Sequence, residues 1–179
     1  MTDKEILNLY FNESSRNVGF SMLLEKYQER TYWHIRKMLI IHEDADDVCQ
    51  EVFIKVFKKL NTFQESSNLF TWIYRIATNE SLNFLRKKKT KFFLPIVDYE
   101  NKLISKISNS DLIDGDKVEL ELQKAILTLP EKQRVVFNLK YFEELDYKQI
   151  SEITGTSVGG LKASYHHAVN KIKNQISTE

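Results

Sequence analysis

The 179 residues carry 26 Lys and Arg against 25 Asp and Glu, and 42% are hydrophobic, a balance typical of a soluble globular protein. The single cysteine, Cys49, excludes an internal disulfide, no apolar run reaches the length of a membrane span, and the polar N-terminus lacks the layout of a secretory signal. With five glycines and two prolines, the composition predicts an all-α protein, and we expect it in the cytoplasm.

Three helices are predicted in the first half of the chain. Apolar residues recur at helical spacing over residues 16–41, and a second helix begins near Asp44. A short loop at residues 63–68, with Ser67 as N-cap, leads into a third helix that runs to about Lys88. We expect one compact bundle. The second helix has its apolar positions at Ala45, Val48, Cys49, Val52, Phe53, Val56 and Leu60.

Charge is segregated within this predicted bundle. Residues 43–51 carry five carboxylates and no Lys or Arg, whereas residues 52–91 carry nine Lys and Arg against two carboxylates. The division favours two different partners for one domain, and a solvated helix start is the alternative interpretation of the carboxylates.

The third helix opens with aromatic residues and closes with cations. Trp72 and Tyr74 lie off the stripe predicted for the core, each about 100° from its neighbour around the helix. Exposed aromatic rings ahead of a basic run suit stacking on unpaired bases and binding of phosphates. Core packing of both rings is the alternative.

Residues 91–116 lose the helical periodicity and are predicted to form a flexible linker. Helices resume near Lys117, and Pro130 stands at the start of another helix, where its missing N–H costs little.

The end of the chain has the layout of a helix-turn-helix motif. Asp146 and Gln149 have the spacing of a capping box. Gly155 suits a left-handed helix stop, and Ser157 can cap the final helix. Small and polar residues on the outer face would let that helix approach a major groove closely. Its apolar stripe is predicted at Val158, Leu161, Tyr165, Val169, Ile172 and Ile176.

The residues of this chain give little support for a catalytic or metal-binding function. His166 and His167 are adjacent on a helix, so their side chains diverge and cannot chelate one ion together. The chain contains no Gly-rich phosphate loop, nucleophile elbow or paired acid and base. We therefore expect no enzyme, no metal and no cofactor, with Cys49 as a small core residue.

Three segments together resemble a bacterial RNA polymerase sigma factor of the sigma-70 family. They are "DADDVCQEVFIKVFKKL" (44–60), "FTWIYRIATNESLNFLRKKK" (70–89) and "LPEKQRVVFNLKYFEELDYKQISEITGTSVGGLKASYHHAVNKIK" (129–173). The small size and the two-domain layout are similar to the extracytoplasmic-function (ECF) group of that family. The resemblance covers nearly the whole chain from about Phe20.

The resemblance implies two roles for the bundle. The acidic second helix would dock on the clamp coiled coil of the largest subunit of core RNA polymerase. The third helix and the loop before it would open and read the minus-ten promoter element, with a flipped base held by the loop. The polymerase-binding residues implied are Asp46, Asp47, Gln50, Glu51 and Ile54. The minus-ten residues implied are Phe63, Glu65, Ser66, Ser67, Asn68, Trp72, Arg75, Asn79, Asn83, Arg86, Lys87 and Lys88.

The resemblance also implies that the last helix reads the minus-thirty-five element from the major groove. It divides the chain into a polymerase-binding and minus-ten domain at 1–90, a linker at 91–116 and a helix-turn-helix domain at 117–179. The expected partners are core polymerase (clamp and second-subunit flap), duplex and single-stranded promoter DNA, and an anti-sigma factor as a candidate. The minus-thirty-five residues implied are Ser157, Lys162, Ser164, His166, His167 and Lys171.

Two other functions compete with this interpretation. A helix-turn-helix regulator that binds duplex DNA without polymerase would need no acidic docking face. A helical adapter that binds only proteins would give no promoter-specific transcript with core polymerase.

Overall fold

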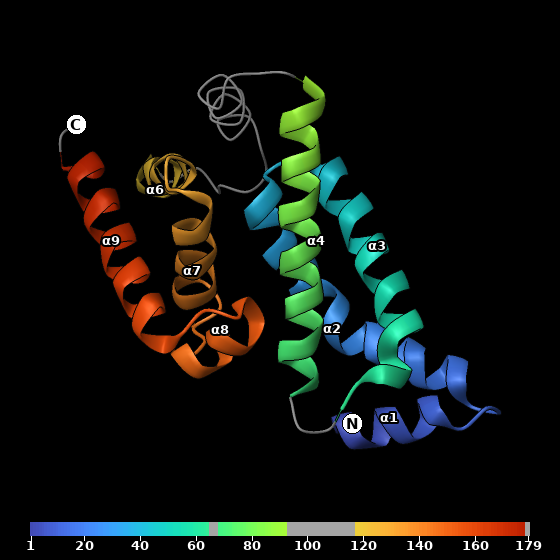
Figure 1. The fold of residues 1–179 in the computed structure, drawn as a ribbon. Coiled ribbons are helices and arrows are strands. Elements are labelled where there is room, and N and C mark those ends of the chain that lie inside the picture. Colours follow the sequence, from blue (N-terminus) through green and yellow to red (C-terminus); the bar gives the residue numbers. More distant parts are fainter. Residues whose placement is uncertain (65–67, 93–116, 178–179) are drawn as a thin grey trace.

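The computed structural model describes residues 1–64, 68–92 and 117–177, and every element in these ranges is helical (Figure 1). The first three predicted helices and the helix-turn-helix are confirmed. Ser67, expected as an N-cap, and nearly all of the expected linker lie outside the described residues. The elements are α1 (Asp3–Phe11), α2 (Arg16–Leu39), α3 (His42–Lys59), the 3-10 turn η1 (Leu60–Thr62), α4 (Leu69–Phe92), α6 (Lys117–Leu127), α7 (Glu131–Tyr141), α8 (Tyr147–Thr154) and α9 (Val158–Ile176).

The first helix was not predicted, although the sequence carries its start signal. Thr2 and Glu5 form a capping box, in which the Glu5 N–H donates to Thr2 Oγ1 and the Thr2 N–H donates to Glu5 Oε2. Helix α1 packs against α2 where Gly19 allows a close approach, because a Cβ there would lie 2.4 Å from the Tyr10 backbone nitrogen.

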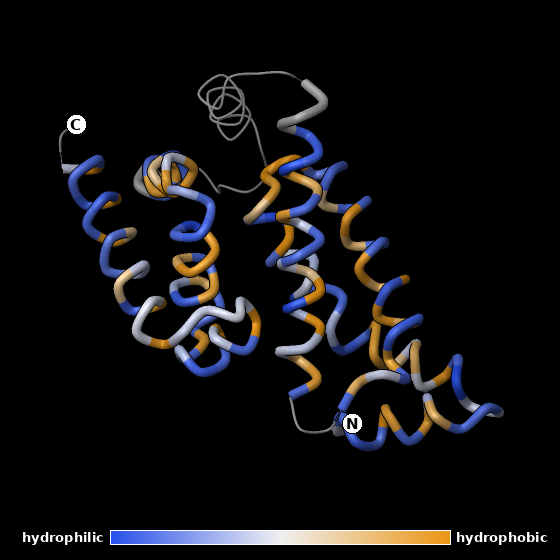
Figure 2. The backbone as a smooth tube through the Cα atoms, viewed as in Figure 1, coloured by the Kyte–Doolittle hydropathy of each residue, from blue (hydrophilic) through white to orange (hydrophobic). Residues whose placement is uncertain are grey.

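The three longer helices of the first half bury the predicted apolar stripe. All seven apolar positions predicted for this helix are buried, the last of them, Leu60, in η1, and α3 packs against both α2 and α4. In Figure 2 hydrophobic and hydrophilic residues alternate along each of these helices, as expected for helices with a buried side. Asn68 contributes a capping hydrogen bond to α4, since its Oδ1 accepts the N–H of Phe70 at 2.9 Å.

The helix-turn-helix forms as the capping residues predict. Asp146 and Gln149 exchange both capping-box hydrogen bonds, Gly155 ends α8 with φ at 70°, and Ser157 Oγ accepts the N–H of Gly160. The stripe on α9 is partly wrong, because Val158 and Ile176 are 40% and 39% exposed. Both lie in terminal turns, where a side chain has fewer covering neighbours. The fully buried residues of α9 are Leu161, Ala168 and Ile172.

The two halves of the chain pack directly on each other. Helix α4 contacts α8, and α2 contacts α7. One apolar cluster runs from the bundle into the second half without a break. Its members from that half are Leu127, Val135, Val136, Leu139, Leu145, Ile150, Ile153 and Leu161. Across the described residues, no helix has both the length and the apolarity to cross a bilayer.

Candidate functional site

The residues expected to bind polymerase share one uncovered face of α3, which we call the acidic face (Asp46, Asp47, Gln50, Glu51 and Ile54). Asp47, Gln50 and Glu51 are exposed, and Ile54 leaves 53% of its surface in solvent. Asp46 is half-exposed and lies 3.3 Å from His42 Nε2. An isoleucine this exposed amid carboxylates and an amide is typical of a protein-binding surface.

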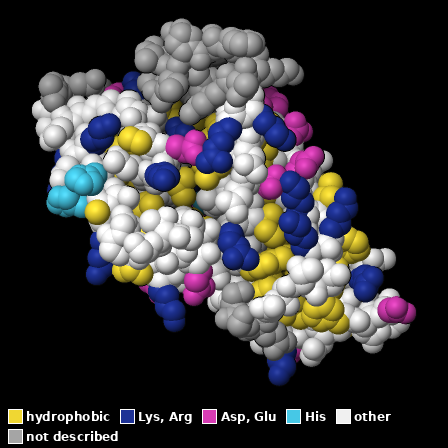
Figure 3. Space-filling view, in the orientation of Figure 1, with side chains coloured by type: hydrophobic (Ala, Val, Ile, Leu, Met, Phe, Trp, Pro, Cys, Tyr) yellow, Lys and Arg dark blue, Asp and Glu magenta, His cyan; other side chains and the backbone are white. Residues whose placement is uncertain are grey.

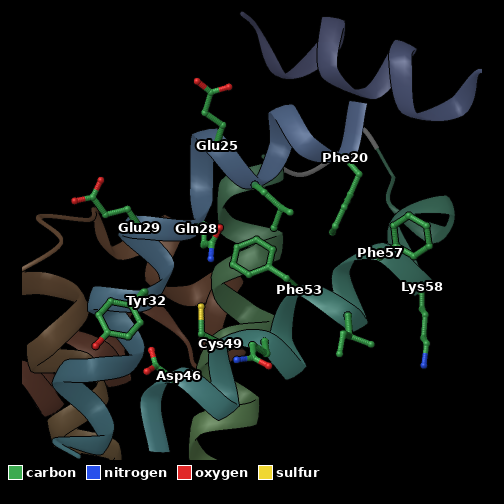
Figure 4. A pocket seen from close by; sticks show the side chains of 13 residues that line it. Phe20, Glu25, Gln28, Glu29, Tyr32, Asp46, Cys49, Phe53, Phe57 and Lys58 are labelled. Carbon is green, nitrogen blue, oxygen red and sulfur yellow. The ribbon is translucent and has the colours of Figure 1, made fainter. Parts of the chain in front are cut away.

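A groove of about 770 Å³ runs between α2 and α3 beside the acidic face (Figure 4). Its walls are aromatic and aliphatic, with Phe53 near the centre and Phe20 and Phe57 toward one end. Glu25 and Glu29 extend from α2 along the rim. The groove thus combines an apolar floor with negative edges, a shape and charge suited to an apolar helix with basic flanks.

The α2 side of this groove was not predicted from the sequence. The signal was present, because Glu25 and Glu29 are one helical turn apart and both carboxylates therefore lie on one face of α2. Cys49 also lines the groove, but burial raises the pKa of its thiol to about 11, so it stays protonated and poorly reactive. Cys49 is buried, as predicted.

The minus-ten residues predicted on α4 are divided between two faces of the helix. Trp72 and Arg75 line a small pocket with Glu152 of α8, and Asn79 and Arg86 line another with residues of α7–α9. Asn83 and Lys87 instead line a hollow between α3 and α4. The structure therefore brings four of these side chains toward the second half of the chain and turns two toward the acidic face.

The expected exposure of Trp72 and Tyr74 is wrong. Trp72 is 8% exposed, with its ring 5.5 Å from that of Phe63, and Tyr74 is 0% exposed. The physical reason is that α4 is covered from several sides, by α2 and α3 and also by α8, so its buried stripe is wider than the apolar pattern indicates. Glu65, Ser66 and Ser67 of the preceding loop lie outside the described residues.

A buried polar group lies beneath Tyr74. His34 is 1% exposed, stacks on the Tyr74 ring at 4.7 Å between centroids, and has its Nε2 2.9 Å from Thr78 Oγ1. Burial, the largest cause, lowers the pKa of His34 to about 4, so the folded protein holds a neutral imidazole.

This histidine predicts a loss of stability in mild acid. The folded-state pKa lies below the ordinary 6.5, so the unfolded chain takes up the proton first, and stability falls as pH drops from 6.5 toward 4. Between about pH 7.5 and about pH 5 the free energy of unfolding should fall by about 2 kcal/mol through His34. Urea unfolding of the wild type and of His34→Gln at both pH values measures this. Equal pH dependence in the two proteins would contradict the assignment.

The cations at the end of α4 are partly paired within the protein. Lys88 forms an ion pair with Asp44 of α3, and Arg86 NH2 lies 2.7 Å from Glu131 Oε1 of α7. In Figure 3 the Lys and Arg side chains gather over α4 and α3, with acidic side chains beside them. The acidic and basic blocks of the sequence are therefore in contact at this end of the bundle, while Arg75 and Lys87 stay exposed.

The outer face of α9 is open. Lys162, His166, His167 and Lys171 are exposed, and Figure 3 shows histidine side chains at the surface over this helix. A Cβ added at Gly159 would meet nothing within 4 Å, so this turn presents backbone to an approaching partner. Ser157 serves as the N-cap, and Ser164 is half-buried in the pocket that Asn79 and Arg86 line.

Within the described part of the chain, no three His, Cys, Asp or Glu side chains are grouped to hold a metal ion. The open surfaces present charge, amides and aromatic edges, which recognise macromolecules by contact.

Two family models match the chain and together span more than half of it. Sigma-70 region 2 matches residues 23–91, which include α3 and nearly all of α4. Sigma-70 region 4 matches residues 119–172, which include the helix-turn-helix.

Similar proteins match over nearly their full lengths. The ECF RNA polymerase sigma factor SigW of Bacillus subtilis (strain 168) is 29% identical over 166 residues, covering 88% of this chain and 89% of that protein. The ECF RNA polymerase sigma-E factor of Escherichia coli (strain K12) is 27% identical, covering 88% of this chain and 86% of that protein.

Two solved structures share the fold. CnrH, determined in complex with the cytosolic domain of CnrY, superposes with a TM-score of 0.71 at 17% identity, over 99% of this chain and 98% of CnrH. The sigma factor RpoE of Bartonella quintana, determined with the anti-sigma factor NepR, gives a TM-score of 0.68 at 20% identity, over 89% and 98% of the two chains.

Proposed function

The chain belongs to the sigma-70 family of RNA polymerase sigma factors, in its ECF group, and we propose how its surfaces carry out promoter-directed transcription initiation. Residues 1–90 bind core polymerase and the minus-ten element, and residues 117–179 bind the minus-thirty-five element. The protein acts in the cytoplasm by binding alone, without a catalytic step of its own.

The observation that carries this proposal is the open acidic face beside the α2–α3 groove. Its carboxylates offer a complement to basic residues of the clamp coiled coil, and Ile54 and Phe57, both exposed, offer apolar anchors. Neither the acidic face nor the groove includes a residue of α6–α9 among the described residues. Polymerase can therefore dock while the second half of the chain stays packed.

Promoter reading is proposed for α4 and α9. On α4, Arg75 lies one turn after Trp72 and Asn79 one turn after Arg75, so an aromatic ring, a cation and an amide follow one another along one face. These groups can neutralise phosphates, bond base edges and stack on an unpaired base. On α9, Lys162 and His166 project from a helix whose first turn is small enough to enter a major groove closely.

A second proposed partner is an anti-sigma factor. The sigma factor RpoE of this fold was determined bound to the anti-sigma factor NepR. On this chain the α2–α3 groove is the surface that such a protein would cover, since it would then compete with polymerase.

The function is tested with purified protein, core polymerase and a library of genomic fragments. We expect discrete transcript starts that share two upstream elements, absent when this protein is omitted. DNA binding without polymerase and without such transcripts would instead support the helix-turn-helix regulator, and no DNA binding at all would support the adapter.

A further inference from the structure

Tyr10 of α1 reaches the end of α3 that borders the α2–α3 groove. Its side chain is 4% exposed, and its hydroxyl donates to the Phe57 carbonyl oxygen at 2.6 Å. Phe57 lies in the last turn of α3, where carbonyls lack an N–H partner within the helix. The hydrogen bond therefore ties α1 to the end of the helix that carries the acidic face.

The ring of Tyr10 also packs against two aromatic walls of the groove. Its centroid lies 5.8 Å from that of Phe57, edge to face, and 6.5 Å from that of Phe20. Phe20 and Phe57 meet each other edge to face at 4.9 Å, and Figure 4 shows both toward one end of the groove. Because each ring lies against the other two, the orientation of Phe57 depends on Tyr10.

Tyr10 is itself held against α2. At Gly19 the two helices come so close that any larger residue would collide with the Tyr10 backbone. Arg16 of α2 lies over the other ring contacts, with its Cζ 5.5 Å from the Tyr10 centroid. The fixed packing of α1 on α2 thus fixes the place of Tyr10 relative to α3.

Phe57 continues the surface proposed to bind polymerase. It follows Ile54 of the acidic face by one helical turn, lines the same groove and is 37% exposed. An aromatic anchor whose orientation is already set loses less side-chain freedom on binding, so less of the interaction free energy is lost. Whatever orients Phe57 in the free protein therefore raises the affinity of this surface.

We propose that Tyr10 is a positioning residue for polymerase docking, which holds Phe57 in the orientation that core polymerase contacts. This inference rests on the proposed function and extends it to α1. Helix α1 lies outside both segments that match the family models, residues 23–91 and 119–172. Tyr10 is buried, so it acts through Phe57 and not by touching the partner.

The test replaces Tyr10 by phenylalanine in the full chain, which keeps the ring and removes the hydroxyl. Tyr27→Phe is the matched control, because the buried Tyr27 of α2 donates its hydroxyl to Asp3 Oδ1 of α1 at 2.7 Å. The control thus loses a hydrogen bond that also anchors α1, but one that does not involve Phe57. Titration of labelled protein with core polymerase measures affinity, and urea unfolding checks that both variants are folded during the titration.

Tyr10→Phe should weaken polymerase binding by roughly 3- to 10-fold, and Tyr27→Phe should leave it unchanged. Phe57→Ala should weaken binding by roughly 10-fold or more, since it removes the anchor itself. In the Phe57→Ala background, Tyr10→Phe should have no further effect, because no ring is left to position. A residue that only stabilises the fold would cause the same loss in both backgrounds.

Three results would each overturn the positioning role and leave the proposed function standing. They are wild-type affinity in Tyr10→Phe, an equal loss in Tyr27→Phe, and an undiminished effect of Tyr10→Phe in the Phe57→Ala background. Failure of the proposed function would look different, because the wild type itself would then bind no core polymerase. That result would overturn both the proposed function and the role of Tyr10.

Discussion

Replacing Asp47 and Glu51 together by lysine is expected to abolish stable association with core RNA polymerase. Both carboxylates are exposed on the acidic face, and neither makes an ion pair within the described residues. Reversing two charges opposite a basic surface turns attraction into repulsion and should weaken binding by about 100-fold or more. Titration of labelled protein with core polymerase measures the change.

The matched control is Glu13→Lys with Glu144→Lys, which makes the same change in net charge at exposed positions elsewhere. This control should bind polymerase as the wild type does. Both proteins should also unfold at similar urea concentrations, because substitutions at exposed side chains usually change the free energy of unfolding by no more than about 0.5 kcal/mol. Undiminished binding of the Asp47 and Glu51 variant would remove the acidic face from the proposed function.

The parts of this fold that the sequence predicts are those set by local chemistry. The capping box at Asp146 and Gln149 and the left-handed stop at Gly155 depend on residues within one turn of each other, and both were confirmed. The stripe on α3 was confirmed as well, since a helix with one covered side repeats its apolar residues regularly.

The burial of Tyr74 could not be predicted from local sequence patterns. Its hydroxyl meets Glu143, 69 residues away, and no local pattern reports a contact of that separation. A tyrosine that lies off the apolar stripe can place its hydroxyl in solvent or against a polar partner inside a second interface. Only the tertiary arrangement distinguishes these two cases. The placement of α8 over Trp72 escaped prediction for the same reason.

The candidate site could be predicted only in part, because some of its residues lie on one helix and others on a second. The acidic face lies on one helix, so the sequence places its members together, and the structure leaves them open. The α2–α3 groove depends on how two helices pack, so the α2 residues Glu25 and Glu29 were not predicted to belong to the site. Residues that share one face of a helix can be identified from their spacing in the sequence. A groove between two helices can be identified only when the packing of the helices is known.

Replacing Trp72 by alanine is expected to prevent promoter melting while polymerase binding survives. The indole lies beside Arg75 on the side of α4 that we propose reads DNA, and with α8 displaced it would be able to stack on an unpaired base. Stacking of this kind is worth about 1–3 kcal/mol per base, so permanganate reactivity of melted thymines should fall roughly 10- to 100-fold. Trp33→Ala is the matched control, because Trp33 is 43% exposed on α2 and should leave melting unchanged.

The same substitution separates a DNA-contacting tryptophan from one that only packs. Trp72 touches Phe63 and is 8% exposed, so its removal also opens a cavity and should lower stability by about 3 kcal/mol. The acidic face lies on α3 and keeps its own support from α2, so polymerase affinity should persist despite that loss. If Trp72→Ala reduced polymerase binding and thymine reactivity in equal proportion, Trp72 would be a packing residue, and strand capture would have to be assigned to other side chains of α4.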